Sequence, residues 1–397
     1  MKVSRLMEAL EGEGVDFYTG VPDSQLKPLC NALMARYGIS AKHRIAANEG
    51  NAVALAAGEF LATGRPACVY MQNSGLGNAV NPVCSLTHPK VYAIPMIFVV
   101  GWRGEPGVKD EPQHVYQGEI TLRTLELLGI EYVVLDKAMT EQDFLARFGA
   151  ITPALREGRT VAVVVRKGAL EGGAGEGEGE ALPQGDVSTG AFSPVGDAGE
   201  GEALPQREES IEALVRTLPK EAMIVSSTGK ISRELFEVRE RLGQDHSRDF
   251  LTVGSMGHGS SIAMRIAERH PERPILCLDG DGAALMHLGA MALIPASGAP
   301  LIHVVLDNGA HETVGGMPTV AGQLDLAGAA LALGYASAAD VSSVAELQKA
   351  VAAALAGPRP AFIRMRVALG ARADLGRPTR TPLQNRDDFM KRLEERL

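Results

Sequence analysis

The sequence predicts an α/β protein built from two doubly wound parallel sheets, and three observations lead to this prediction. Short, continuous apolar runs alternate with stretches of helical periodicity along both halves of the chain. Such runs are typical of parallel strands whose two faces are both covered by helices. A segment at 169–209 that is poor in large apolar residues separates the halves, and a length of 397 residues allows two or three domains.

The first half, residues 1–168, is expected to form the N-terminal domain. A helix is predicted over 49–63, between the second and third of its six apolar runs. Doubly wound sheets bind ligands at the carboxyl ends of their strands, so the residues just after each run are the ones to examine. The predicted strands lie in DFYTGVP (16–22), RIAAN (44–48), ACVYMQN (67–73), PMIFVVGW (95–102), EYVVLD (131–136) and TVAVVVR (160–166).

The second half, residues 210–397, repeats this rhythm and is expected to form the C-terminal domain. The segment between the halves, 169–209, consists mainly of Gly, Glu, Ala, Pro and Gln, and contains GEGEALPQ twice. This composition predicts a flexible acidic linker, because it offers too little apolar surface to offset the entropy of ordering the chain. The predicted strands of the second half lie in AMIVSST (222–228), DFLTVG (249–254), PILCLDGDG (274–282), LIHVVLDN (301–308) and AFIRMRV (361–367).

Charge and composition exclude several kinds of partner. The chain has 39 Lys and Arg against 48 Asp and Glu, a net charge of −9, and no basic block stands out. Nucleic acid and anionic membranes are therefore not expected as partners. A run of about 18 apolar residues and a signal-peptide pattern are both missing, so a cytoplasmic protein is expected. The four cysteines lie far apart without a C-x-x-C pair, and we interpret them as buried thiols.

The most informative segment joins two neighbouring predicted strands. One strand ends in Gly280-Asp281-Gly282, a helix follows, and the next strand ends in Asp307-Asn308. Because these ends lie close together in a parallel βαβ unit, the Asp281 carboxylate and the Asn308 amide oxygen can converge on a hard cation such as Mg²⁺. The glycines and the start of the helix supply backbone N–H donors for a phosphate. Together these groups predict a magnesium diphosphate site.

Two other interpretations of the Gly-rich turns stay open at this point. A lone G-D-G triplet is often an ordinary turn between a strand and a helix. A nicotinamide site needs a third glycine where Leu285 stands and an acid about 20 residues beyond Asp281, and the chain has neither. The turn Asn-Ser-Gly-Leu-Gly-Asn at 73–78 also departs from the dinucleotide pattern, because Val80 occupies its last small-residue position.

The spacing of the G-D-G segment resembles the signature of thiamine diphosphate enzymes. G-D-G is followed by 24 residues and then Asp307-Asn308, where that family has Asn-Asn. The resemblance implies that Asp281, Asn308 and the backbone carbonyl of Ala310 bind Mg²⁺. It also implies a catalytic carboxylate at the start of a helix in the other domain, which protonates the aminopyrimidine ring of the cofactor, and Glu49 stands there.

The same resemblance implies the rest of the cofactor site. Met256, which lies 25 residues before Asp281, would bend thiamine diphosphate into a V shape, and the Gly254 carbonyl would accept a hydrogen bond from its amino group. The two halves would be the pyrimidine-binding (PYR) and diphosphate-binding (PP) domains. The implied cofactor-binding residues are Glu49, Ser227, Thr228, Gly229, Gly254, Met256, Gly280, Asp281, Gly282, Ala283 and Asn308.

Further segments look like the phosphonopyruvate decarboxylase family. This resemblance implies a lyase that converts 3-phosphonopyruvate to phosphonoacetaldehyde and CO₂ in phosphonate and antibiotic biosynthesis. A phosphonate needs charge-assisted donors, and Asp23, Arg103, Lys109 and His311 are expected to line the substrate site. The matching segments are GVPDSQLKP, AANEGNAVALAAG, MQNSGLGNAVNP, GWRGEPGVKDEPQH, GSMGH, GDGAALMHLGA, AHETVGGMPT and LGRPT.

Three alternatives to this function stay open. Sulfopyruvate decarboxylase is the close one, because a sulfonate and a phosphonate are near isosteres. A non-catalytic subunit of the same fold is expected to lack some of Glu49, Asp281 and Asn308, and all three are present. A carboligase similar to acetolactate synthase needs one more domain. The family resemblance further implies a homo-oligomer, at least a dimer, with active sites at the subunit interface.

Overall fold

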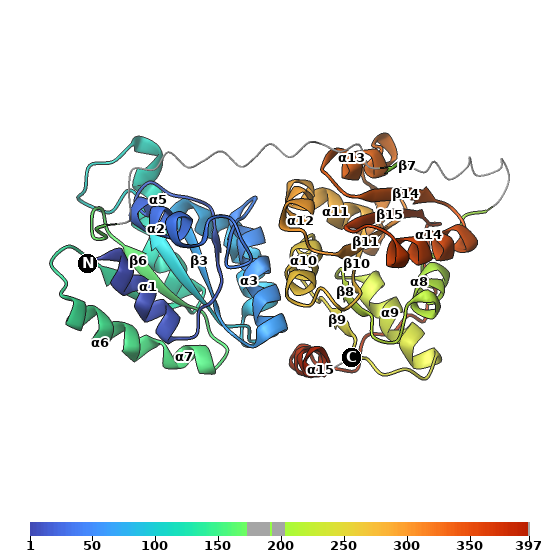
Figure 1. The fold of residues 1–397 in the computed structure, drawn as a ribbon, viewed down its shortest axis with the longest axis horizontal. Helices are drawn as coiled ribbons and strands as arrows, with labels where there is room; N and C mark the ends of the chain where they lie inside the picture. The colour runs from blue at the N-terminus through green and yellow to red at the C-terminus, as the bar shows by residue number, and fades with distance from the viewer. Residues whose placement is uncertain (173–190, 193–202, 396–397) are drawn as a thin grey trace. The chain divides into compact units, whose positions relative to one another are not determined.

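The computed structural model of the chain describes residues 1–172, 191–192 and 203–395 (Figure 1). The chain divides into two compact units, Met1–Gln184 and Gly185–Leu397, and each is described by itself. The predicted linker lies mostly outside the described residues. At its two described ends, Ala169 and Leu170 pack into the core of the first unit and a helix begins at Arg207. In the described part of the chain, no helix is both long and apolar enough to cross a membrane.

The first unit is a six-stranded parallel sheet in the order β2-β1-β3-β4-β6-β5. Helices α1, α2 and α6 share one hydrophobic core with its strands. The strands are β1 (Tyr18–Gly20), β2 (His43–Ile45), β3 (Ala67–Gln72), β4 (Met96–Gly101), β5 (Glu131–Leu135) and β6 (Val161–Val165). The helices are α1 (Val3–Gly12), α2 (Lys27–Tyr37), α3 (Glu49–Thr63), α4 (Leu76–Pro82), α5 (Pro112–Leu127), α6 (Glu141–Ile151) and α7 (Pro153–Arg156).

The second unit contains a seven-stranded parallel sheet in the order β7-β14-β15-β11-β10-β8-β9 and a short antiparallel hairpin, β12-β13. Helices α8, α9 and α14 share one core with its strands. The strands are β7 (Ala191–Phe192), β8 (Met223–Ser226), β9 (Asp249–Leu251), β10 (Ile275–Gly280), β11 (Leu301–Asp307), β12 (Ala310–His311), β13 (Met317–Pro318), β14 (Ser337–Val341) and β15 (Ala361–Arg366). The helices are α8 (Arg207–Thr217), α9 (Lys230–Arg241), α10 (Gly259–Arg269), α11 (Asp281–Met286), α12 (Leu293–Ser297), α13 (Leu326–Ala332), α14 (Val344–Ala356) and α15 (Pro382–Glu394).

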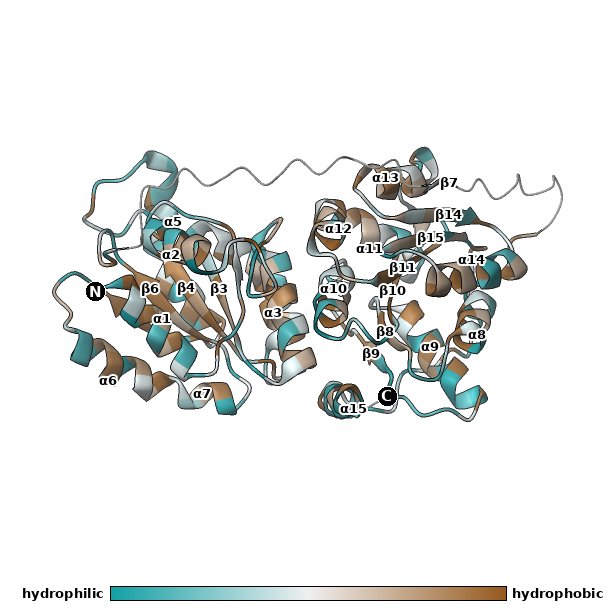
Figure 2. Cartoon of the chain, in the orientation of Figure 1, coloured by the Kyte–Doolittle hydropathy of each residue, from teal (hydrophilic) through white to brown (hydrophobic). Residues whose placement is uncertain are grey.

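The predicted α/β fold with two parallel sheets is confirmed. Ten of the eleven predicted apolar runs contain a strand, and the run at 44–48 overlaps the end of β2. Figure 2 shows hydrophobic residues along the strands of both sheets. Four strands were not predicted: β7 and β14 of the parallel sheet, and β12 and β13 of the hairpin. In β14 the polar residues Ser337 and Asp340 interrupt the apolar run, and β7 is only two residues long.

The two sheets share one strand order. If the strands of each unit are numbered in chain order, leaving aside β7 and the hairpin, both sheets have the order 2-1-3-4-6-5. The chain runs to one side from the first strand and then crosses to the other, so the order reverses between β1 and β3 and between β8 and β10. Ligand crevices of doubly wound sheets lie at such switch points, outside the carboxyl ends of the strands.

Candidate active site

A pocket lies at the switch point of the second sheet, beyond the ends of β8, β10 and β11. Its volume is about 270 Å³. Eleven of the predicted site residues line it, although the sequence places them in four separate segments: Ser227, Thr228, Gly229, Met256, Gly280, Asp281, Gly282, Ala283, Asn308, Ala310 and His311. Gly254, on the loop after β9, is not among the lining residues.

Asp281 is the first residue of α11 and is buried. Its Oδ2 atom accepts a hydrogen bond from the hydroxyl of Thr319, which lies beyond the β12-β13 hairpin. Burial raises the pKa of Asp281, and the hydrogen bond from Thr319 opposes this shift. The sequence analysis missed Thr319, because no periodicity links a loop residue to a strand end 38 positions away.

Asn308 follows β11 and has both ends of its amide engaged. The Oδ1 atom accepts a hydrogen bond from the backbone N–H of Ala310 at 3.1 Å, and Nδ2 donates to Oε2 of Glu312 at 2.9 Å. The preceding Asp307 is committed elsewhere, because its Oδ2 accepts from Nε of Arg364 at 2.7 Å inside the unit. The site-forming residue of the pair is therefore Asn308.

Glu312 pairs with two basic side chains, and these also line the pocket. Its carboxylate accepts from Nη1 of Arg207 at 2.6 Å and from Nζ of Lys230 at 2.7 Å, and all three residues line the pocket. Burial alone would raise the pKa of Glu312, but the hydrogen bonds from Lys230 and Arg207 outweigh it and the pKa is lowered. Sequence reasoning missed these three residues, although Lys230 directly follows the predicted Ser227–Gly229 segment.

Met256 sits on a tightly turned loop. Ser255 has a φ of 55° and Gly257 a φ of 82°, so the backbone is left-handed on both sides of Met256. The buried His258 ring fixes this turn, because its Nδ1 lies 3.0 Å from the hydroxyl of Ser255. Burial and the charge of His287 lower the pKa of His258 to about 4, so the ring is neutral at physiological pH.

The missing side chain of Gly282 lets Met256 and His311 approach the backbone at this point of the pocket. A Cβ atom at Gly282 would lie 2.6 Å from Cε1 of His311 and 3.3 Å from Cε of Met256. The backbone can therefore meet both side chains only because residue 282 has none. This close approach explains the second glycine of the G-D-G motif in physical terms.

Glu49 begins α3 in the first unit, as the sequence predicts, and is buried. The helix is capped by Asn48, whose side chain accepts from the N–H of Asn51 at 3.0 Å. Oε2 of Glu49 accepts from Nδ2 of Asn78 at 2.8 Å, and a Cβ atom on Gly75 would come within 2.4 Å of Cγ of Glu49. Both contacts come from the Gly-rich turn at 73–78, to which the sequence analysis assigned no contact with Glu49.

The residues expected to grip the substrate do not gather in one unit. Asp23, Arg103 and Lys109 belong to the first unit, whereas His311 lines the pocket of the second. The Arg103 guanidinium pairs with Asp110 through two hydrogen bonds of 2.8 and 2.5 Å. Arg103 is therefore not a free cation. The pairing lowers the pKa of Asp110, and the sequence analysis did not predict it.

Asp23 and Lys109 differ sharply in their surroundings. Lys109 is exposed, as expected of a loop lysine. Asp23 is buried after β1, and burial raises its pKa. Its Oδ1 atom has no hydrogen-bond partner among the described residues, and a Cβ on Gly101 would come within 2.3 Å of Oδ2. Asp23 thus offers an unpaired oxygen at the switch point of the first sheet.

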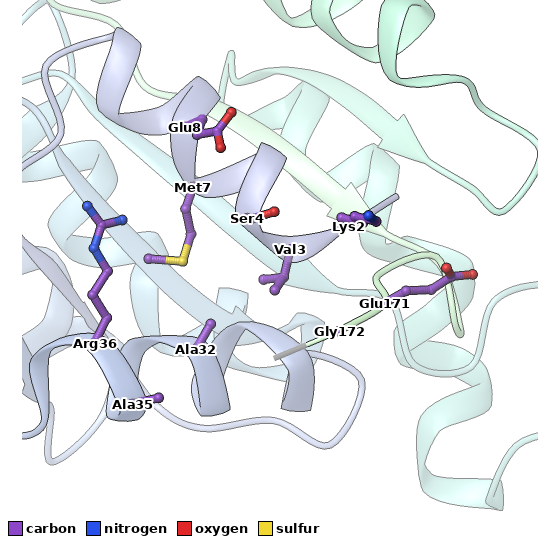
Figure 3. Close-up of a pocket in the computed structure, with 10 residues that line it drawn as sticks. All are labelled: Lys2, Val3, Ser4, Met7, Glu8, Ala32, Ala35, Arg36, Glu171 and Gly172. Carbon is purple, nitrogen blue, oxygen red and sulfur yellow. The ribbon is translucent and has the colours of Figure 1, made fainter. Parts of the chain in front are cut away.

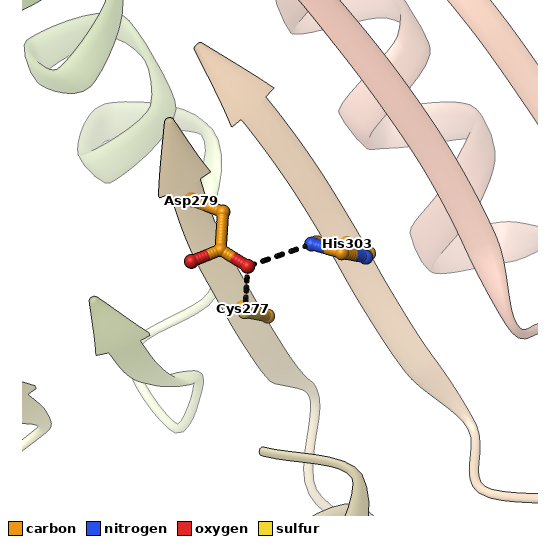
Figure 4. Close-up of side chains that lie close together, drawn as sticks. All are labelled: Cys277, Asp279 and His303. Carbon is orange, nitrogen blue, oxygen red and sulfur yellow. Dashed lines mark hydrogen bonds and ion pairs between the residues drawn. The ribbon is translucent and has the colours of Figure 1, made fainter. Parts of the chain in front are cut away.

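A second polar cluster lies inside the second sheet (Figure 4). Cys277, Asp279 and His303 are close enough in the described part of the chain to hold a metal ion. However, the Asp279 carboxylate already accepts from the thiol at 3.4 Å and lies 3.0 Å from Nε2 of His303. Burial raises the pKa of Cys277 far above its usual value, so the group stays a thiol. We therefore interpret the cluster as a hydrogen-bonded part of the core.

The prediction that all four cysteines are buried is wrong for two of them. Cys68 and Cys277 are buried, Cys30 is half-buried and Cys84 is exposed. Cys84 lies on the helical turns after β3, where the apolar residues of the segment face inward and the thiol does not. All four are free thiols.

The first unit has a larger hollow, of about 590 Å³, between α1 and α2 (Figure 3). It is lined mainly by Val3, Met7, Ala32 and Ala35, with charged side chains such as Glu8 around them. None of the predicted site residues lines it. The pocket at the β8/β10 switch point is therefore the better candidate for the active site.

Comparisons with known proteins give the family of the chain. Residues 1–127 match the family described as thiamine pyrophosphate enzyme, N-terminal TPP binding domain, and residues 228–365 match the corresponding C-terminal TPP binding domain. Phosphonopyruvate decarboxylases of Streptomyces viridochromogenes and Streptomyces hygroscopicus are each 36% identical to the chain, over 96% of this chain and 91% of theirs. A sulfopyruvate decarboxylase of Methanosarcina acetivorans is 31% identical, over 85% of this chain and 84% of its own.

Solved structures support the fold alone. The benzoylformate decarboxylase of Polynucleobacter necessarius superimposes with a TM-score of 0.68, covering 94% of this chain and 100% of its own. Its sequence identity to this chain is 13%, so the likeness concerns the architecture and not the substrate.

Proposed function

The chain belongs to the thiamine pyrophosphate enzyme family and is a decarboxylase that uses this cofactor, and we propose that its substrate is 3-phosphonopyruvate. The products would be phosphonoacetaldehyde and CO₂, as a step of phosphonate biosynthesis. The observation that carries the proposal is 36% identity to phosphonopyruvate decarboxylases along 96% of the chain, with the expected metal-binding residues around one pocket.

The residues of the pocket fit a diphosphate held through a divalent cation. Asp281, Asn308 and Ala310 all line the pocket. Their carboxylate, amide and backbone carbonyl oxygens are hard ligands of the kind Mg²⁺ prefers. The glycines on either side of Asp281 leave the backbone open to an anion. We propose that these three groups bind Mg²⁺ and that Ser227, Thr228 and Gly229 contact the cofactor from the end of β8.

Loss of CO₂ from a 2-oxo acid leaves a carbanion, and bound thiamine diphosphate supplies the electron sink that stabilises it. Met256 would support the cofactor from the loop that His258 fixes. Glu49 would hold a proton for the N1′ atom of the pyrimidine ring. The hydrogen bond from Asn78 to Oε2 holds the Glu49 carboxylate in place for this role.

The active site is proposed to form between subunits of a homo-oligomer, at least a dimer. Glu49 of one subunit would face the cofactor that Asp281 and Asn308 of another subunit hold. Asp23, Arg103, Lys109 and His311 are proposed to line the substrate site. Asp23 has an unpaired oxygen to offer, whereas Arg103 would act together with Asp110 as a pair of opposite charges.

Sulfopyruvate is the second candidate substrate, because a sulfopyruvate decarboxylase matches 85% of the chain at 31% identity. An assay of CO₂ release from both substrates, with thiamine diphosphate and Mg²⁺ added or withheld, decides between them. We expect faster CO₂ release from phosphonopyruvate, and we expect this release to require both thiamine diphosphate and Mg²⁺. The variants Glu49→Gln and Asp281→Ala should lose this activity. Faster release from sulfopyruvate would reassign the substrate, and full turnover in Glu49→Gln would overturn the proposed mechanism.

A further inference from the structure

The Asn308 side chain has one orientation that suits a cation and one that does not. An amide presents an oxygen on one side and an NH₂ group on the other, and only the oxygen binds Mg²⁺. The two orientations have nearly the same shape, so the hydrogen-bond partners of the amide decide between them. The groups around Asn308 therefore control its capacity to bind metal.

Glu312 removes the ambiguity. It accepts from Nδ2 of Asn308 at 2.9 Å, and a carboxylate can only accept, so the NH₂ side of the amide must face Glu312. On the other side, Oδ1 accepts from the N–H of Ala310 at 3.1 Å. That bond uses one of the two lone pairs of Oδ1 and leaves the second one for a cation.

The Glu312 carboxylate is itself held by two positively charged side chains from different helices. Nη1 of Arg207, at the start of α8, lies 2.6 Å from its Oε2, and Nζ of Lys230, at the start of α9, lies 2.7 Å from its Oε1. Arg207 is in turn anchored by two bonds of 2.7 Å to the buried Glu234. The Glu312 carboxylate is thus held at both oxygens and cannot turn away from Asn308.

We propose that Glu312 is a positioning residue of the metal site, which holds the Asn308 amide with its oxygen toward the cation. This inference rests on the proposed role of Asn308 as a Mg²⁺ ligand. Groups that orient a metal ligand typically contribute about 10- to 100-fold to metal affinity. A network that only tied α8 to α9 would affect stability and leave the affinity for Mg²⁺ unchanged.

The test is the Mg²⁺ dissociation constant of the full-length protein at saturating thiamine diphosphate, measured by calorimetric titration. Glu312→Gln should weaken Mg²⁺ binding about 10- to 100-fold, because the introduced amide can also donate and so allows Asn308 to flip. Glu237→Gln is the matched control, since Glu237 pairs with Arg372 in the same unit but does not line the pocket. It should bind Mg²⁺ like the unmodified protein.

Asn308→Asp distinguishes a positioning role of Glu312 from a merely structural one, because only a positioning role predicts that this change restores Mg²⁺ affinity. An aspartate has an oxygen on both sides, so its orientation no longer matters. In the Glu312→Gln background it should restore most of the lost Mg²⁺ affinity. In the presence of Glu312 it should instead weaken binding, because two carboxylates would then face each other.

Three results would overturn or redirect the inference. Unchanged Mg²⁺ affinity in Glu312→Gln, or a loss that Asn308→Asp does not restore, would contradict the positioning role. If Asn308→Ala also binds Mg²⁺ normally, the proposed metal site itself is wrong, which separates this failure from that of the inference. If circular dichroism shows that Glu312→Gln does not fold, Glu312→Met replaces it in the same comparison with the same expected loss and rescue.

Discussion

Gly75 is needed for space and not for backbone freedom. Its φ of −71° is open to any residue, but its Cβ would lie 2.4 Å from Cγ of Glu49. An alanine therefore keeps the turn and displaces the carboxylate that we propose to exchange the proton. Gly75 and Asn78 of the turn at 73–78 thus both help to place the side chain of Glu49.

Gly75→Ala should cost about 1–3 kcal/mol of stability through overpacking and should lower turnover much more than it lowers the folded fraction. Gly149→Ala is the matched control. Gly149 lies in α6 with no atom within 4 Å of its virtual Cβ, so this change should stabilise the protein by about 0.4–1 kcal/mol. Chemical denaturation and CO₂ release measure the two effects. Normal turnover in Gly75→Ala would show that the position of Glu49 does not matter.

His258 makes stability depend on pH in a defined window. Its pKa is about 4 in the folded protein and about 6.5 when unfolded, so the unfolded chain binds more protons between these values. The contribution of neutral His258 is therefore fully present above pH 6.5 and is lost as the pH falls toward 4. The groups that face it are His287, whose pKa burial also lowers, and Asp279.

His258→Asn, which keeps a polar group near Ser255, should be less stable at pH 7 but should lose stability less steeply on acidification. One titrating group contributes at most about 1.4 kcal/mol per pH unit, and that is the largest difference in slope we expect. Denaturation at several pH values between 7 and 4 measures it. Parallel curves for the two proteins would mean that His258 does not titrate in this window.

Several site residues that the sequence predicted directly follow strands, whereas several of those it missed lie in irregular segments. Asp281, Asn308 and Ser227 follow strands, and parallel strands bring their carboxyl ends to one edge. Thr319 and Glu312 act from the segment after β11, whose path no periodicity encodes. The pairing of Arg103 with Asp110 was missed for the same reason, because it closes an irregular loop.

At the scale of elements, the sequence predicted strands best where both faces are buried. β3, β4 and β6 are nearly continuous apolar runs, whereas β14 lies next to the edge strand β7 and has Ser337 and Asp340 among its five residues. A strand near the edge needs less apolar surface, so its pattern resembles a loop. Helix α3 was predicted over its full length from its helical periodicity, and in the structure Asn48 and Gly64 cap its two ends.

The cap of α3 links helix stability to the site. Asn48→Ala removes a side-chain cap and should cost about 1 kcal/mol. Ser343→Ala, which removes the cap of α14, should cost a similar amount and is the control. Only Asn48→Ala should also reduce turnover, because Glu49 is the next residue. Equal turnover in the two variants, measured at equal folded fraction, would show that the Asn48 cap does not affect the function of Glu49.

At the scale of the whole molecule, the two units repeat one architecture with different chemistry at the same place. Each sheet has a switch point, flanked by Asp23 and the 73–78 turn in the first unit and by the Ser227 and Asp281 segments in the second. In the described part of the chain, the first unit presents the carboxylates of Asp23 and Glu49, and the second presents the oxygen groups that we propose as cation ligands. This division fits an enzyme whose cofactor is protonated by one domain and anchored by the other.

The central claim is that Glu49 of one subunit and Asp281 of another serve the same cofactor. The most direct test is to co-express the two inactive variants, Glu49→Gln and Asp281→Ala, and to measure CO₂ release by the mixed assembly. In a mixed dimer one site carries both changes and the other carries neither, so random pairing should restore about a quarter of the unmodified activity. Activity no greater than that of either variant alone, in assemblies shown to contain both chains, would contradict the account.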